Sequence, residues 1–220
     1  MKAFYFPALL VALTLLFTQC KKDTSSTGNG DYSRLTTGSS WTYRYTEGTA
    51  APATFKLTAT SKDTTVTGGR VYKVLTSSDG ARNSYLGKSG SDYYRFASFP
   101  SLGIDSFEEL YLKDNVGVNG TWSGEATIVY MSASIKGNLA YTVKGKGESR
   151  TVLTNTFNNV VHVRLDITLP TFANINVGGG DFYYAEGVGL IESNILVTPP
   201  VFVGGTPYSS HQELVSYEIK

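Results

Sequence analysis

Cysteine is almost absent from this chain, which holds a single Cys20 among its 220 residues. One cysteine cannot form a disulfide within its own molecule, and it cannot build a metal site from several thiolates. Histidine is nearly as scarce, because only His162 and His211 occur and they lie in separate segments. We therefore expect no metal site and no cofactor.

An excess of charge of either sign is also missing. The chain has 19 basic and 18 acidic residues, and Lys2 is the only charged residue among the first 19. A chain that begins at Cys20 would therefore be formally neutral. Binding to nucleic acid depends on clustered Lys and Arg that contact phosphates. We exclude nucleic acid as a partner.

Catalytic motifs are missing too. Gly87-Lys88-Ser89 imitates the end of a phosphate-binding loop, but Arg82 stands where that loop needs its first Gly. The same stretch falls one residue short of a Gly-x-Ser-x-Gly nucleophile elbow, and no HExxH, EF-hand or dinucleotide-binding motif occurs. We expect no enzymatic activity. The sequence leaves open a pair of carboxylates contributed by two distant strands, as in glycosidases.

Three groupings of titratable residues could in principle do acid–base chemistry or bind metal. His162 and Asp166 fall on one face of a predicted strand, but Arg164 stands between them, so a solvated face with an Arg164–Asp166 contact is favoured. Glu108 and Glu109 are adjacent and would project to opposite faces of a strand. His211 beside Glu213 is a weak metal signal.

Helical periodicity is missing throughout, and alternation of apolar and polar residues takes its place. In Val161–Thr168, for example, the odd-numbered residues are apolar and the even-numbered ones polar. Such alternation predicts an all-β domain built on a single curved antiparallel meander with few or no helices. The predicted strands are Trp41–Tyr45, Phe55–Thr60, Val71–Leu75, Asn83–Gly87, Asp92–Phe96, Glu109–Leu112, Ala126–Ile135, Asn138–Lys146, Val160–Leu169, Phe182–Ala185, Gly189–Ile195 and Leu214–Ile219.

A long hydrophobic run occurs at the start of the chain, where Lys2 precedes an apolar stretch from Phe4 to Phe17. Fourteen residues are too few for a membrane span, which needs about 20, but they suit the apolar region of an export signal. The polar stretch that follows Cys20 is rich in Ser, Thr and Gly and predicts a flexible tether. The predicted division is a signal peptide at 1–19, the tether at 20–30 and one β domain at 31–220.

The segment Leu16-Phe17-Thr18-Gln19-Cys20 resembles the lipobox of bacterial lipoproteins. This resemblance implies that Cys20 becomes the lipidated first residue and that membrane lipid is a partner of the protein. The alternative is ordinary secretion with a free thiol. Lys21 stands where an Asp would resemble an inner-membrane retention signal. We therefore expect an anchor in the outer membrane, facing the periplasm or the cell surface.

Three further segments resemble a group of uncharacterised bacterial outer-membrane lipoproteins: Leu35–Tyr43, Gly120-Thr121-Trp122 and the hairpin Tyr183–Ser193. The resemblance implies a curved sheet similar to the half-barrel of LolA/LolB-type lipoprotein carriers. It implies no established activity and no functional residue. The residues of the hairpin themselves predict a tight bend at Gly187 and Gly189, with Tyr184 and Leu190 packed inward.

Apolar residues are unexpectedly frequent in three predicted connections, Phe96–Ile104, Leu169–Val177 and Ile195–Val203. Loops normally face water, so these could line the mouth of the sheet and bind an apolar ligand or acyl chain. Covering of sheet edges is the alternative explanation. The candidate lining residues are Phe96, Phe99, Phe172, Ile195, Val201 and Phe202.

A second hypothesis is an envelope scaffold or interaction module. Its binding face would be rich in tyrosine and include Tyr93-Tyr94 and Phe182-Tyr183-Tyr184. Tyr is favoured at interfaces because it buries a large area and keeps a hydroxyl for hydrogen bonding. The partner would be an envelope protein or a glycan.

Overall fold

The structure is a computed structural model, and it describes residues 30–66, 69–80, 83–99, 104–130, 133–198, 200 and 206–220. Within these residues the chain forms twelve strands, and the one helical element that appears there is a 3₁₀ turn at Pro170–Phe172. The strands are β1 (Ser40–Glu47), β2 (Ala53–Thr65), β3 (Val71–Ser77), β4 (Ser84–Ser89), β5 (Asp92–Phe99), β6 (Ile104–Lys113), β7 (Thr121–Tyr130), β8 (Ala133–Val152), β9 (Asn155–Leu169), β10 (Ile175–Ala185), β11 (Gly189–Val197) and β12 (Tyr208–Glu218).

The prediction of a single antiparallel sheet is confirmed. All twelve strands belong to one sheet, in the order β6-β5-β4-β3-β2-β1-β12-β11-β10-β9-β8-β7. The predicted segment Ala126–Ile135 is wrong in one respect, because it runs from the end of β7 into β8 and so spans two strands. Alternation that continues from one strand into the next hides the boundary between them from sequence reading.

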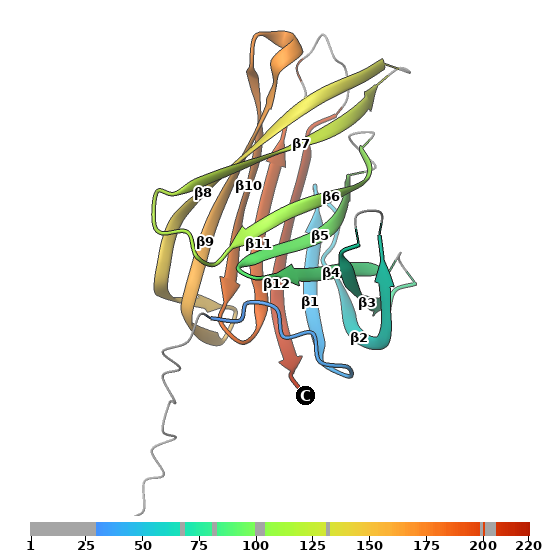
Figure 1. The fold of residues 1–220 in the computed structure, drawn as a ribbon, viewed down its shortest axis with the longest axis vertical. Coiled ribbons are helices and arrows are strands. Elements are labelled where there is room, and N and C mark those ends of the chain that lie inside the picture. Colours follow the sequence, from blue (N-terminus) through green and yellow to red (C-terminus); the bar gives the residue numbers. More distant parts are fainter. Residues whose placement is uncertain are drawn as a thin grey trace, which may run out of the picture.

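The sheet curves further than a half-barrel and nearly closes (Figure 1). The first and last strands pair with each other, so the break falls between β6 and β7, which are neighbours in the chain. Trp122 of β7 bridges this seam by donating its indole N–H to the carbonyl of Leu110 on β6, at 2.9 Å. The seam is thus held by a side chain where the ladder of backbone hydrogen bonds stops.

Side chains divide between the two faces of the sheet as the alternation predicts. On β9, Val161, Val163, Leu165 and Ile167 are all buried, while the residues between them are partly exposed. Burial of each such side chain contributes roughly 1.5–3 kcal/mol to the free energy of unfolding. The concave face of the curved sheet is therefore the core of the molecule.

The segment that precedes β1 crosses one end of the curved sheet. Tyr32 is 5% exposed, and its backbone N–H donates to the hydroxyl of Tyr93, which in turn lies 2.8 Å from a carboxylate oxygen of Asp114. The carbonyl of Asp31 accepts a hydrogen bond from the N–H of Gly187 at 2.7 Å. These contacts fix the chain directly after the predicted tether against the body of the protein.

The bend predicted at Gly187 and Gly189 is confirmed. Gly187 has a φ of 76° and Gly189 a φ of 107°, values that residues with a Cβ rarely adopt. Between them, the carbonyl of Val188 accepts a hydrogen bond from the indole of Trp41 at 2.8 Å. Tyr184 and Leu190 pair across the hairpin.

Candidate functional site

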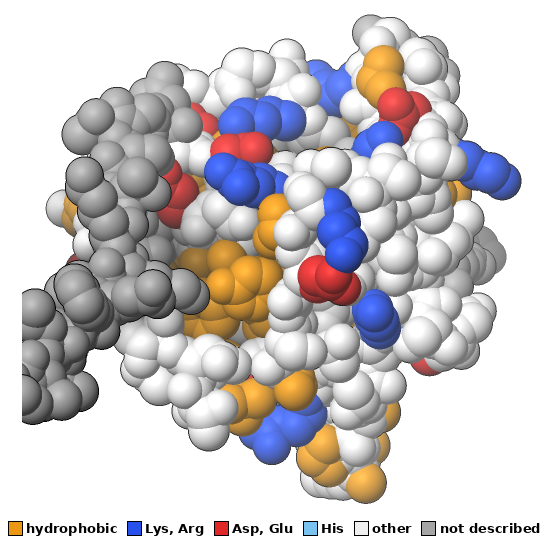
Figure 2. Space-filling view, turned by 90° about the horizontal axis from the view of Figure 1, so that it is seen from below, with side chains coloured by type: hydrophobic (Ala, Val, Ile, Leu, Met, Phe, Trp, Pro, Cys, Tyr) orange, Lys and Arg blue, Asp and Glu red, His pale blue; other side chains and the backbone are white. Residues whose placement is uncertain are grey.

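A cavity of about 230 Å³ lies inside the curve of the sheet, between β1–β6 and the β10–β11 hairpin. The side chains around it come from segments far apart in the sequence, because curvature of the sheet brings β1 and β5 opposite β10 and β11. Its apolar and aromatic lining consists of Leu35, Trp41, Tyr43, Phe55, Leu57, Leu75, Tyr85, Leu86, Phe96, Tyr111, Tyr184, Val188 and Leu190, with Tyr32 at its cover. Viewed from below, apolar side chains gather in a hollow at this end of the molecule (Figure 2).

Polar groups are few in the wall of this cavity. They include Ser33, Ser84, Arg95 and Gln212. Tyr184 also lines the cavity, and it is only 2% exposed. Its hydroxyl has no hydrogen-bond partner among the residues that the structure describes. A buried hydroxyl without a partner is unfavourable by about 1–3 kcal/mol, which marks this position for a ligand or an ordered water.

Arg95 forms a buried ion pair with Glu109 of the neighbouring strand. The Nε of Arg95 donates to Oε2 of Glu109 at 2.6 Å, and Nη2 donates to Oε1 at 3.2 Å. Tyr141 of β8 donates its hydroxyl to the same Oε1 at 2.8 Å. The Glu109 side chain is 2% exposed and that of Arg95 20% exposed. Charge pairing at this depth depends on complete hydrogen bonding, since a lone buried charge is strongly unfavourable.

Burial dominates the electrostatics of the site. It raises the pKa of Tyr111 to about 12 and the pKa of Tyr184 well above its ordinary value. Burial has the largest single effect on Arg95 and would lower its pKa, but the charge of Glu109, the hydrogen bond to it and the nearby tyrosines together raise the pKa. Arg95 is therefore a permanent cation and the tyrosines are neutral donors near neutral pH.

The six residues predicted to line a ligand site lie in different places. Phe96 lines the cavity and packs against the ring of Tyr72, with centroids 5.0 Å apart. Phe172 and Ile195 both pack against the main core, and Ile195 also borders a separate open groove. The side chains of Phe99, Val201 and Phe202 lie outside the described residues, as does Cys20.

Three of these residues belong to strands and not to loops, and one of them, Phe99, ends β5. Phe96 is in β5, opposite Glu108, and Ile195 is in β11, opposite Gly180 and Ser210. The predicted connections were too long because ladder hydrogen bonds to the neighbouring strands extend each strand beyond its clearest alternation. The role of Phe96 and Ile195 as ligand-lining residues stays a prediction.

Sequence reading missed Arg95 as a site residue, and it placed Tyr184 either inward in the hairpin or on a tyrosine-rich interaction face, but not in a cavity wall. Glu108 and Glu109 do project to opposite faces, as expected. Glu108 is exposed and contacts Arg70 and Tyr72, whereas Glu109 points into the core. Alternation alone could have placed Arg95 and Glu109 on the core face, but their pairing needs the register of β5 on β6.

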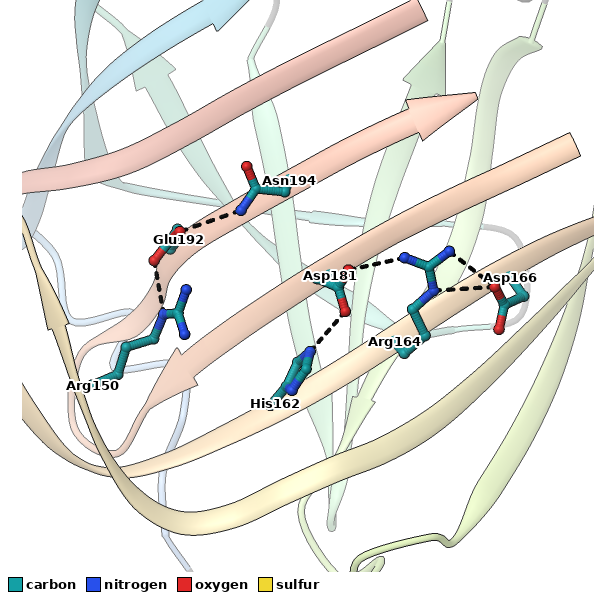
Figure 3. Close-up of polar contacts among 7 residues, drawn as sticks. All are labelled: Arg150, His162, Arg164, Asp166, Asp181, Glu192 and Asn194. Carbon is teal, nitrogen blue, oxygen red and sulfur yellow. Dashed lines mark hydrogen bonds and ion pairs between the residues drawn. The ribbon is translucent and has the colours of Figure 1, made fainter. Parts of the chain in front are cut away.

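The outer face of β8–β11 carries a network of polar contacts and ion pairs (Figure 3). Arg164 contacts Asp166 at 3.0 Å, as predicted, and also Asp181 at 2.9 Å. His162 pairs with Asp181 at 2.7 Å and not with Asp166, which removes the arrangement needed for an acid–base pair of His162 and Asp166. Arg150 of β8 similarly pairs with Glu192 at 2.7 Å. We interpret this network as a solvated polar surface.

Metal ligation finds no support in the described residues. His211 lies 3.5 Å from Glu192 and 3.9 Å from Glu213, distances that fit ion pairs on this outer face. The residues that the structure describes contain no group of three or more His, Cys, Asp or Glu side chains placed to hold a metal ion. The same residues include no helix with the length and hydropathy of a membrane span.

Comparisons with known proteins give structural likeness at low sequence identity. No protein-family model matches the chain, and no curated protein sequence matches it. A presumed lipoprotein from Parabacteroides distasonis is 14% identical, with a TM-score of 0.48 over 86% of this chain and 99% of its own. A presumed exported protein with a YmcC-like fold from Bacteroides fragilis is 11% identical, with a TM-score of 0.46 over 83% of this chain and 96% of its own. The hypothetical lipoprotein YmcC of Escherichia coli is 9% identical, with a TM-score of 0.43 over 80% of this chain and 83% of its own.

Proposed function

We propose that this protein is a lipid-anchored protein of the bacterial outer membrane that binds a small apolar molecule in the cavity inside its curved sheet. The observation that supports binding is the cavity itself, which has an apolar and aromatic wall with a few polar groups. Small-molecule sites in proteins have this composition, because apolar surface supplies affinity and a few polar groups supply orientation.

The volume of the cavity indicates the size of the ligand. Protein interiors are packed as densely as organic crystals, and few of their voids exceed a water molecule. A volume of about 230 Å³ equals the space of roughly eight waters at about 30 Å³ each. An engineered apolar cavity of about 150 Å³ in another protein stays dry and binds benzene. The cavity described here therefore suits one small molecule or part of a longer chain.

The anchor is supported by the sequence. The apolar run ends shortly before Cys20, and the folded body begins only after a polar stretch. We expect the Cys20→Ser variant to lose acyl labelling and to move from the membrane fraction to the soluble fraction. Unchanged labelling and partition of this variant would refute the anchor without bearing on the cavity.

Ligand binding is tested by filling the cavity. Leu190 lines it and is partly buried, so Leu190→Phe adds volume at its wall. Leu196→Phe is the matched control, because Leu196 is 58% exposed and lies away from the cavity. We expect native mass spectrometry to find a bound small molecule on the wild-type protein and the control, and its loss from Leu190→Phe. Equal retention by all three proteins would exclude the cavity as the site.

The alternative of a tyrosine-rich interaction face receives less support. Tyr93, Phe182 and Tyr184 are each at most 3% exposed, so they belong to the core and cannot meet a partner. Tyr94 lies beneath the guanidinium of Arg70 at 3.5 Å, and Tyr183 lies beneath that of Arg150 at 3.3 Å. The predicted face is thus divided between the two sides of the sheet. Absence of enzymatic activity stays a prediction.

A further inference from the structure

The hydrogen bonds in the cavity wall restrict the chemistry of what can bind there. Glu109 accepts from Nε and Nη2 of Arg95 and from the hydroxyl of Tyr141, so its carboxylate is well supplied with donors. On the Arg95 side, the hydrogen bonds found among the described residues use Nε and Nη2 and leave Nη1 available. Tyr184 adds a hydroxyl without a partner in the same part of the structure.

Arg95 and Tyr184 therefore still offer N–H donors, which cannot accept a hydrogen bond, and a hydroxyl, which can donate one. A guanidinium has five N–H bonds and no acceptor, and a tyrosine hydroxyl can donate one hydrogen bond. A ligand that satisfies them must bring an acceptor oxygen, and its remainder must fit an apolar wall. A pure hydrocarbon would leave these donors unsatisfied, which disfavours it as the natural ligand.

Charge decides between an anionic and a neutral acceptor. Arg95 already has its counter-ion in Glu109, so the two charges cancel. A carboxylate ligand at the free nitrogen of Arg95 would add a second anion close to Glu109 in a buried site. Like charges repel strongly when they are shielded from water, and the pair would then hold an excess negative charge. A neutral carbonyl oxygen accepts the same hydrogen bonds without this repulsion.

We propose that the cavity recognises a neutral acyl compound, in which the carbonyl oxygen of an ester or amide accepts hydrogen bonds from Arg95 and Tyr184 and the hydrocarbon part packs against the apolar wall. This proposal rests on the proposed function and specifies its ligand. Two sources of such a group are available. One is a free small ester or amide, and the other is the ester-linked lipid on Cys20 of the same protein, since ten tether residues reach roughly 17 Å and the cavity begins at Tyr32.

The experiment measures calorimetric binding of two probes, methyl octanoate and octanoate, near neutral pH, where octanoate is ionised. The protein is the full chain with Cys20→Ser, which leaves the cavity intact and removes its own lipid. We expect methyl octanoate to bind at least about tenfold more tightly than octanoate. In the double variant Arg95→Met/Glu109→Leu the wall carries no charge, and the discrimination should fall to about threefold or less. Arg164→Met, on the outer face, should retain the full discrimination.

The outcomes separate this proposal from the proposed function. Equal or tighter binding of octanoate would overturn the neutral-acyl specificity while it leaves the cavity as a ligand site. Failure of both probes to bind, together with a ligand-free protein in native mass spectrometry, would refute the proposed function as well. Failure of both probes while native mass spectrometry finds another ligand would overturn the acyl specificity alone. Binding of methyl octanoate to Cys20→Ser but not to the lipidated protein would assign the cavity to the protein's own acyl chain.

Discussion

Removal of one partner from the Arg95–Glu109 pair should be far more damaging than removal of both. Arg95→Met leaves a carboxylate that is 2% exposed with only the hydroxyl of Tyr141 as a donor. Breaking a buried ion pair in this way costs about 3–5 kcal/mol, whereas an apolar replacement of the whole pair is often neutral. The same reasoning applies to Glu109→Leu, which leaves the guanidinium without its counter-ion.

The size of the effect can be followed through a mutant cycle. In a domain of this length, each kcal/mol shifts the melting temperature by about 2–4 °C, so either single variant should melt roughly 6–20 °C lower. The double variant should lose only about 1–3 kcal/mol, because the hydroxyl of Tyr141 then has no acceptor. Addition of Tyr141→Phe should recover most of this loss.

Urea denaturation followed by circular dichroism measures the required free energies. A coupling energy of at least about 3 kcal/mol between positions 95 and 109 is expected from the single and double variants. Additive losses, in which the double variant is destabilised by the sum of the two single variants, would refute the interpretation of a closed, buried pair. Such a result would mean that water solvates each charge when its partner is removed.

Three other predictions concern the backbone, the tyrosines and the seam. Gly178→Ala should destabilise the protein by more than about 1 kcal/mol, because the φ of Gly178 is 107° and a Cβ there would lie 2.1 Å from the carbonyl oxygen of Leu196. Gly117→Ala is the control, because a Cβ at Gly117 has no atom within 4 Å, and it should be nearly neutral in the same urea assay. Burial raises the pKa of Tyr111 to about 12, so its contribution to stability is complete below about pH 10 and is lost as the pH rises towards 12. The phenolate absorbance of Tyr111, measured as the difference between the wild type and Tyr111→Phe, should therefore appear together with unfolding, and a cooperative fold that survives ionisation of Tyr111 would contradict this. Trp122→Phe removes the hydrogen bond across the β6–β7 seam and should lower the free energy of unfolding by about 1 kcal/mol. Amide hydrogen exchange in β6 should become faster, and unchanged exchange would contradict the prediction.

The fold was largely predictable because strand periodicity is a local signal. The alternation in Val161–Thr168 specifies which side chains of β9 face the core without knowledge of any other strand. The positive φ of Gly187 and Gly189 is equally local, since few other residues tolerate such a bend. The pairing of β1 with β12 is not a local feature, because these strands lie at opposite ends of the chain. This pairing determines where the seam falls, so the position of the seam could not be predicted from local sequence.

The candidate site was much less predictable, because it depends on register. Arg95 and Glu109 look like ordinary charged residues of two strands until the pairing of β5 with β6 places them opposite each other. Tyr141 is distant in sequence and reaches the same carboxylate only because the sheet curves. Aromatic runs such as Phe182-Tyr183-Tyr184 suggested a surface, but alternation buries the first and third of these residues.

The most direct measurement is native mass spectrometry of the protein isolated from its own cells, followed by organic extraction and identification of the released molecule. The expected result is one neutral ester or amide per protein molecule, carrying a hydrocarbon part small enough to fit a cavity of about 230 Å³. A protein that is free of small molecules in its native membrane, and that stays so when neutral acyl compounds are supplied, would contradict the central claim that this cavity is a binding site.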